Sequence, residues 1–62
     1  MVATKKQIHF IECLAIDLEL DRQRRNAHVS EVVGREIKFL DELTISEACI
    51  VIDQLKFYKD EE

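Results

Sequence analysis

Three residues with metal-binding side chains, His9, Cys13 and Asp17, stand four positions apart and would line one face of a helix. His28 and Cys49 could join them through folding. Imidazole, thiolate and carboxylate groups are the ligands that zinc takes in proteins. Zinc sites of the finger type use closely paired ligands such as Cys-x2-Cys and His-x3-His, and this chain has no such pair. We therefore expect no metal site and no cofactor.

The same residue types could serve nucleophilic catalysis, in which a histidine removes the proton of a cysteine thiol. That chemistry also needs an oriented base and hydrogen-bond donors for the developing oxyanion. A chain of 62 residues buries only about 60% of its unfolded surface and has no room for a deep cleft. We therefore expect a protein without enzymatic activity.

Basic residues gather in the middle of a chain that is otherwise acidic. Positions 21–40 contain Arg22, Arg24, Arg25, Arg35 and Lys38 against Asp21, Glu31 and Glu36. The formal net charge of −4 argues against strong nonspecific DNA binding, which depends on many phosphate contacts. Guanidinium groups make bidentate hydrogen bonds with carboxylates, so the cluster predicts a site for an acidic peptide, with phosphate as the alternative ligand. A third interpretation, that the arginines at positions 22, 24 and 25 form only a solvated helix face, stays open.

Length and composition predict a single all-α domain that comprises residues 1–62. The chain has no proline and one glycine, so it offers few of the residues that tight hairpin turns require. Charged residues make up 35% of it and hydrophobic residues 47%, which is too hydrophobic for a disordered tail and typical of amphipathic helices. We expect a compact three-helix domain with a short connector between the second and third helices.

Local signals mark where the three helices begin and end. The start signals are capping boxes at Thr4 with Gln7 and at Thr44 with Glu47, and an N-cap at Asp21. Gly34 can adopt the left-handed conformation that ends a helix. These signals predict helices over about 5–19, 22–33 and 45–59, joined by a connector that forms an extended piece or one helical turn.

Apolar residues at helical spacing predict one shared core. Its expected members are Ile8, Ile11, Leu14, Ala15 and Leu18, then Ala27, Val29, Val32 and Val33, then Ile37, Phe39, Leu40 and Leu43 of the connector, and finally Ile45, Ala48, Val51, Ile52 and Leu55, with Tyr58 extending this last stripe. We expect Cys13 and Cys49 to be small buried hydrophobes, and a disulfide between them stays open. Phe10, Ile16 and Phe57 lie off these stripes, and if exposed they would form a patch for a partner or for a homo-oligomer.

Membrane insertion and secretion find no support in the sequence. No uninterrupted apolar run approaches the roughly 20 residues of a membrane span. The first six residues are not followed by a hydrophobic region of the signal type. A cytoplasmic location without membrane contact is therefore the expectation.

Several segments resemble the C-terminal domain of phage single-strand annealing proteins of the lambda Red beta type. They are Lys6-Gln7-Ile8 through Leu20, Gly34-Arg35-Glu36-Ile37-Lys38, Asp41-Glu42-Leu43-Thr44, Ser46-Glu47-Ala48 and Leu55-Lys56. The resemblance spans about residues 5–59, and its motifs are mostly helix boundaries and core positions. It does not include the large N-terminal annealing domain of that family, so the sequence fits an excised domain as well as a free-standing relative.

The resemblance implies a small helical domain that docks an annealing protein onto partners without annealing DNA itself. The implied partners are a companion exonuclease and the acidic C-terminal tail of a single-stranded DNA-binding protein. By position, Arg35 and Lys38 match basic residues of the family's connector. The arginines at positions 22, 24 and 25 fall where the family is acidic, so they are supported by charge alone.

Our main hypothesis is a protein-interaction module of phage-type DNA recombination. We expect Arg35 and Lys38 to grip an acidic peptide beside Phe39, with help from Arg22, Arg24 and Arg25. The alternative is a small nucleic-acid-binding domain in which the same basic side chains contact phosphates.

Overall fold

The structure, a computed structural model, describes residues 1–61 and confirms the all-α fold. It contains three α-helices and one short 3-10 helix: α1 (Lys5–Asp17), α2 (Arg22–Val33), η1 (Leu40–Glu42) and α3 (Ile45–Asp60). The predicted bounds of the second helix are met, and the third helix ends one residue later than predicted. The connector that joins α2 to α3 contains a single helical turn, which is one of the two forms that the sequence left open.

The predicted helix caps are present. The hydroxyl of Thr4 accepts a hydrogen bond from the amide of Gln7, and Thr44 accepts one from Glu47, each at 3.1 Å. A carboxylate oxygen of Asp21 accepts one from the amide of Arg24 at 2.7 Å. Each cap supplies a partner for an amide that the first helical turn leaves unpaired. Gly34, with φ of +78°, ends α2 in the left-handed conformation.

The first helix ends at Asp17, two residues before the predicted end. Glu19 takes a left-handed conformation with φ of +60°, and the amide of Leu20 donates to the carbonyl of Ala15 at 2.8 Å. The amide of Glu19 donates to Ile16, which completes a Schellman motif. The sequence has no glycine at this turn, so the usual signal for such an ending was missing.

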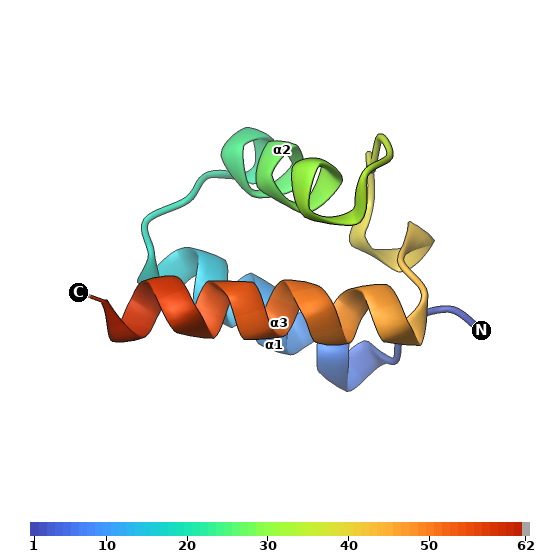
Figure 1. Cartoon of the computed structure of the whole chain (residues 1–62), viewed down its shortest axis with the longest axis horizontal. Helices are drawn as coiled ribbons and strands as arrows, with labels where there is room; N and C mark the ends of the chain where they lie inside the picture. The colour runs from blue at the N-terminus through green and yellow to red at the C-terminus, as the bar shows by residue number, and fades with distance from the viewer. Residues whose placement is uncertain (62) are drawn as a thin grey trace.

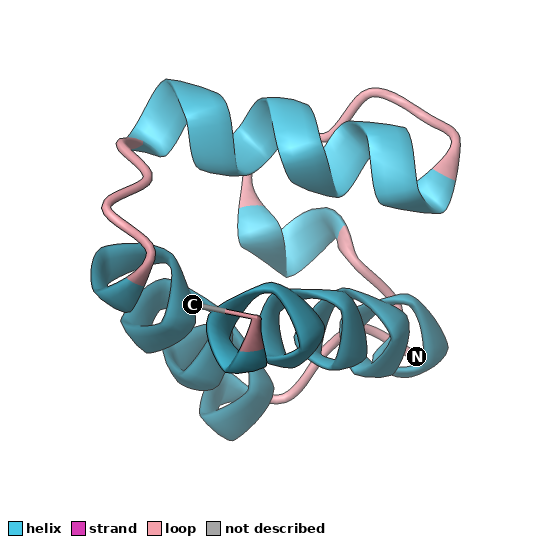
Figure 2. Ribbon diagram, turned by 60° about the vertical axis from the view of Figure 1, so that its left-hand side comes forward, coloured by secondary structure: helices cyan, strands magenta, loops and turns pink. Residues whose placement is uncertain are grey.

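Helices α1 and α3 lie side by side and run in the same direction, as Figure 1 shows. At their N-terminal ends the side-chain amide of Gln7 donates to the carbonyl of Ile45 at 3.3 Å, and at their C-terminal ends Lys59 contacts Asp17 at 2.7 Å. Helix α2 packs across this pair, with η1 filling the space where the chain returns to α3 (Figure 2). The segment before α1 adds an isolated bridge between Val2 and Thr44.

One core joins all four elements. It consists of Ala3, Ile11, Leu14, Val29, Ile37, Leu40, Leu43, Ala48, Val51 and Leu55. Helix α2 contributes a single fully buried side chain, Val29, whereas the connector contributes three. The connector therefore compensates for the thin apolar face of α2, and it holds that helix over the other two.

Several expectations about burial are wrong, among them those for Ala27, which is exposed, and for Tyr58, which is 47% exposed. Cys13 and Cys49 are exposed free thiols, because the inner side of α1 is filled by Ile11, Leu14 and Ala15 and that of α3 by its own aliphatic residues. Phe39 is 56% exposed, whereas its connector neighbour Leu40 is buried. Phe10, Ile16 and Phe57, whose exposure the sequence left open, are exposed in the structure.

None of the helices that residues 1–61 form is long and apolar enough to cross a membrane.

Candidate functional site

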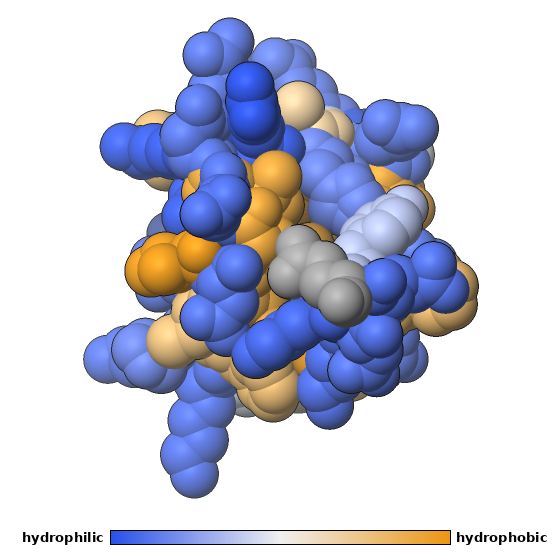
Figure 3. Space-filling model, turned by 90° about the vertical axis from the view of Figure 1, so that its left-hand side faces the viewer, coloured by the Kyte–Doolittle hydropathy of each residue, from blue (hydrophilic) through white to orange (hydrophobic). Residues whose placement is uncertain are grey.

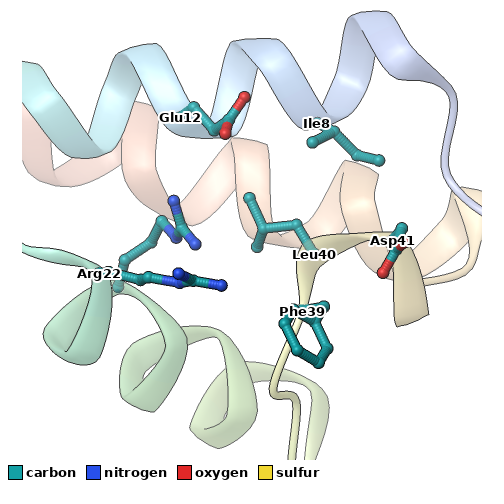
Figure 4. Close-up of a pocket in the computed structure, with 7 residues that line it drawn as sticks. Ile8, Glu12, Arg22, Phe39, Leu40 and Asp41 are labelled. Atoms are coloured by element: carbon teal, nitrogen blue, oxygen red, sulfur yellow. The ribbon is translucent and has the colours of Figure 1, made fainter.

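A groove of about 500 Å³ lies between α1, the start of α2 and the connector. It is lined by Ile8, Glu12, Arg22, Arg25, Phe39, Leu40 and Asp41, and we call it the arginine groove. Figure 4 shows Ile8 and Glu12 on the α1 side, Arg22 on the α2 side, and Phe39 with Leu40 on the connector. The groove thus combines guanidinium groups with an aromatic ring and aliphatic side chains.

Arg22 lies against the face of the exposed aromatic ring. Its Cζ atom is 5.7 Å from the centroid of the Phe39 ring, which is within the range of a cation–π contact. This contact leaves the nitrogen atoms of the guanidinium able to donate hydrogen bonds elsewhere. Arg22 and Phe39 therefore form one surface that can contact charge and apolar groups together.

Arg25 is oriented by its neighbour on α2. Its Nε atom donates to the side-chain oxygen of Asn26 at 3.2 Å, and the Asn26 amide nitrogen donates to the carbonyl of Lys38 at 2.9 Å. This chain of hydrogen bonds links α2 to the connector and restricts the arginine side chain. Part of the groove is therefore pre-organised.

Neither groove arginine is neutralised by an ion pair within residues 1–61. The ion pairs of this part of the chain join Arg35 to Glu47 and Lys59 to Asp17. Glu12 and Asp41 line the same groove without forming an ion pair with Arg22 or Arg25. The guanidinium groups can therefore donate hydrogen bonds to an external carboxylate. The carboxylates of Glu12 and Asp41 limit how much further negative charge the groove can bind.

Arg35, which the sequence indicated as a partner-binding residue, makes contacts inside the molecule. Its Nε and Nη2 atoms donate to the two carboxylate oxygens of Glu47 at 3.1 and 2.8 Å. Nη2 also donates to the carbonyl of Glu42 at 2.8 Å. This bidentate pair, with a hydrogen bond from the amide of Thr44, lowers the pKa of Glu47 to about 2. Arg35 therefore fastens the connector to the start of α3.

Glu42 completes this network on the connector. One of its carboxylate oxygens accepts hydrogen bonds from the amides of Lys38 and Phe39 at 2.9 and 2.7 Å. These two bonds lower the pKa of Glu42 below its ordinary value. The network holds the backbone of the connector in place, and with it the side chains of Phe39 and Leu40 that line the groove.

The six residues that the sequence indicated are thus divided. Arg22, Arg25 and Phe39 meet in the arginine groove, whereas Arg24, Arg35 and Lys38 do not line it. Arg24 and Lys38 are exposed. Sequence reasoning missed Glu12 and Asp41 as groove residues, because only the packing of α1 beside the connector brings them to the arginines.

A second hollow, of about 270 Å³, lies between the segment that follows α1, the middle of α2 and the C-terminal half of α3. It is lined by Leu18, Leu20, His28, Leu55 and Tyr58. Figure 3 shows hydrophobic surface at this end of the molecule between hydrophilic side chains. The Nε2 atom of His28 is buried there without a hydrogen-bond partner among the described residues, and its ring meets the Tyr58 ring edge to face at 5.4 Å.

Of the two hollows, only the arginine groove presents charged donors to an external ligand. Comparison with protein-family models, with characterised proteins and with solved structures finds no match to this chain.

Proposed function

We infer that this chain is a non-catalytic protein-interaction module that docks an acidic peptide of a partner in the arginine groove. The observation that carries this proposal is the pair of guanidinium groups, Arg22 and Arg25, that lack a carboxylate partner among residues 1–61 and adjoin the exposed ring of Phe39. Charge-assisted bonds from arginine to carboxylate are strong and directional. An aromatic or aliphatic side chain of the same peptide would cover Phe39 and Leu40.

The proposed setting is phage-type DNA recombination, on the strength of the sequence resemblance. The proposed partner is the acidic tail of a single-stranded DNA-binding protein, and a phage exonuclease is the other candidate. The contacts of Arg35 move the proposed site from the connector to the start of α2, because Arg35 already has a bidentate carboxylate. Lys38, which is exposed on the connector, would contribute only charge near the groove.

Charge reversal tests the docking site. We expect the double variant Arg22→Glu and Arg25→Glu to lower the affinity for an acidic tail peptide by about tenfold or more, because each lost charged hydrogen bond is worth about 1.5–3 kcal/mol. Arg24→Glu is the matched control for each single variant, Arg22→Glu and Arg25→Glu, since it changes the charge by the same amount on the same helix but outside the groove. The measurement is the dissociation constant from isothermal titration calorimetry.

The control also separates docking from helix stability. Acidic residues near a helix N-terminus are favourable, so none of these substitutions should weaken α2. Equal affinities for the three single variants, Arg22→Glu, Arg25→Glu and Arg24→Glu, would refute docking in the arginine groove.

A second candidate function is binding of single-stranded nucleic acid, which the neighbouring arginine and exposed aromatic ring also suit. Glu12 and Asp41 in the groove and the net charge of −4 disfavour it, because phosphate would meet both acids. If this chain binds nucleic acid, its affinity should fall steeply with salt for an oligonucleotide of any sequence. If it is a peptide-docking module, it should not bind the oligonucleotide.

A further inference from the structure

The solvent-exposed side of α1 carries two side chains of types that bind metal ions, His9 and Cys13. The Sγ atom of Cys13 lies 3.5 Å from the Nε2 atom of His9, one helical turn earlier. Both residues are exposed, and the thiol is free. The regular helix from Lys5 to Asp17 keeps them on the same face.

Their separation matches that of two ligands on one tetrahedral zinc ion. Zinc binds thiolate sulfur at about 2.3 Å and imidazole nitrogen at about 2.0–2.1 Å, so a tetrahedral angle places the two ligand atoms about 3.5 Å apart. His9 and Cys13 already have this spacing without any change of the backbone. A borderline-soft divalent cation prefers this combination of nitrogen and sulfur.

A single chain supplies only half of such a site. Residues 1–61 contain no group of three side chains arranged to hold a metal ion. Asp17, the next residue along this face, already forms an ion pair with the ammonium group of Lys59 at 2.7 Å. A structural zinc site takes four protein ligands, so two more must come from another molecule.

Apolar surface adjoins the half-site on both sides along the helix. Phe10 and Ile16 stand three residues before and after Cys13 and are 42% and 72% exposed. A two-fold symmetric contact would bring the same patch of two chains together, covering these side chains and placing two histidines and two cysteines around one ion.

We propose that His9 and Cys13 form half of a zinc-class metal site that a second copy of this chain completes. On binding, each Cys13 thiol releases its proton to solvent and each His9 coordinates through a neutral imidazole nitrogen. Neither residue lines the arginine groove, so the dimer retains two grooves. Two linked grooves bind a multivalent partner more tightly than one.

The test is metal-dependent dimerisation of the reduced, tag-free chain. Light scattering with and without Zn²⁺ should show a doubling of the mass, with one ion bound per two chains. Co²⁺ in place of Zn²⁺ should give the visible absorption of a tetrahedral site and a sulfur-to-metal charge-transfer band. Cys13→Ser and His9→Gln should each abolish the doubling and both absorption features.

Cys49→Ser is the matched control, because Cys49 is the other exposed thiol and lies on α3. It should dimerise with Zn²⁺ as the unaltered chain does. An unchanged mass in the presence of Zn²⁺, one ion bound per single chain, or full dimerisation of Cys13→Ser would overturn the proposal. Because the substituted residues are exposed, circular dichroism should show the same helix content in every variant.

Discussion

Arg35 is held against the connector and the start of α3 by the carboxylate of Glu47 and the carbonyl oxygen of Glu42. The first of these contacts has a direct consequence for stability against acid. Arg35 and the amide of Thr44 lower the pKa of Glu47 from an ordinary value of 4.5 to about 2. A carboxyl group whose pKa is lower in the folded state stabilises that state only when it is ionised.

The contribution of Glu47 should therefore be fully present above about pH 4.5 and lost as the pH falls toward 2. In the variant Glu47→Gln, the free energy of unfolding should not show the part of the decrease at low pH that comes from protonation of Glu47. The measurement is urea denaturation at a series of pH values between 2 and 7. Glu31→Gln, on the exposed side of α2, should keep the original profile. If Glu47→Gln kept it too, the assignment of the acid sensitivity to this pair would be wrong.

Glu19 is strained in a way that a single substitution can relieve. Its φ of +60° places a side-chain-bearing residue in the left-handed position of a Schellman motif, where glycine is the usual residue. Glu19→Gly should raise the free energy of unfolding by up to about 1 kcal/mol, after the greater entropy of glycine in the unfolded chain is subtracted.

The reciprocal substitution at the end of α2 is the control for this prediction. Gly34 has φ of +78°, and a Cβ at this residue would have open space around it to 4 Å. Gly34→Ala should therefore lower the free energy of unfolding by about 1 kcal/mol through backbone strain alone. Both changes can be measured by urea denaturation. A stabilised Gly34→Ala or a destabilised Glu19→Gly would contradict this explanation of the two helix ends.

Sequence signals suffice for residues whose partners are local. Thr4, Asp21, Thr44 and Gly34 could be predicted because each acts on amides or carbonyls within a few residues of itself. The contacts of Arg35 could not be predicted, since they depend on the path of the connector.

At the scale of elements, α2 and the connector are joined by Ser30. Its hydroxyl accepts a hydrogen bond from the amide of Ile37 at 2.8 Å and donates one to the carbonyl of Asn26 at 2.8 Å. Ile37 is buried, so its amide would have no access to water if this partner were removed. This joint matters for the proposed docking site because the same connector brings Phe39 and Leu40 into the arginine groove.

Ser30→Ala should therefore lower the free energy of unfolding by about 1–3 kcal/mol, the cost of leaving a buried donor unpaired. Ser46→Ala, at an exposed position of α3, should change it by no more than about 0.5 kcal/mol. Thermal or urea denaturation would measure both. Equal stability of the two variants would show that the Ser30 bond does not hold the connector.

The order and class of the elements could be read from the sequence, whereas the connector could be predicted only as either an extended piece or one helical turn. The early end of α1 could not, because Glu19 takes a conformation for which its residue type is a poor signal. The exposure of Phe39 could not be predicted either, since the connector buries every third side chain, Ile37, Leu40 and Leu43, and leaves those between them exposed.

For the whole molecule, the arrangement of α1, α2 and the connector decides which basic residues can act together. The sequence predicted one cluster of five basic residues. The fold divides it into two groove arginines, one arginine that fastens the connector, and two exposed residues outside the groove. Ile8 and Glu12 reach the groove from α1, which is distant in sequence, so periodicity and charge could not place them there.

The measurement that tests the central claim most directly is an NMR titration of the isotope-labelled chain with an acidic, phenylalanine-ended tail peptide. A short single-stranded oligonucleotide serves as the parallel titration. We expect the peptide to shift the signals of Arg22, Arg25, Phe39 and Leu40, Arg35 to change little, and the oligonucleotide to shift none of them. Peptide shifts centred on Arg35 and Lys38, or shifts produced by the oligonucleotide alone, would contradict docking in the arginine groove.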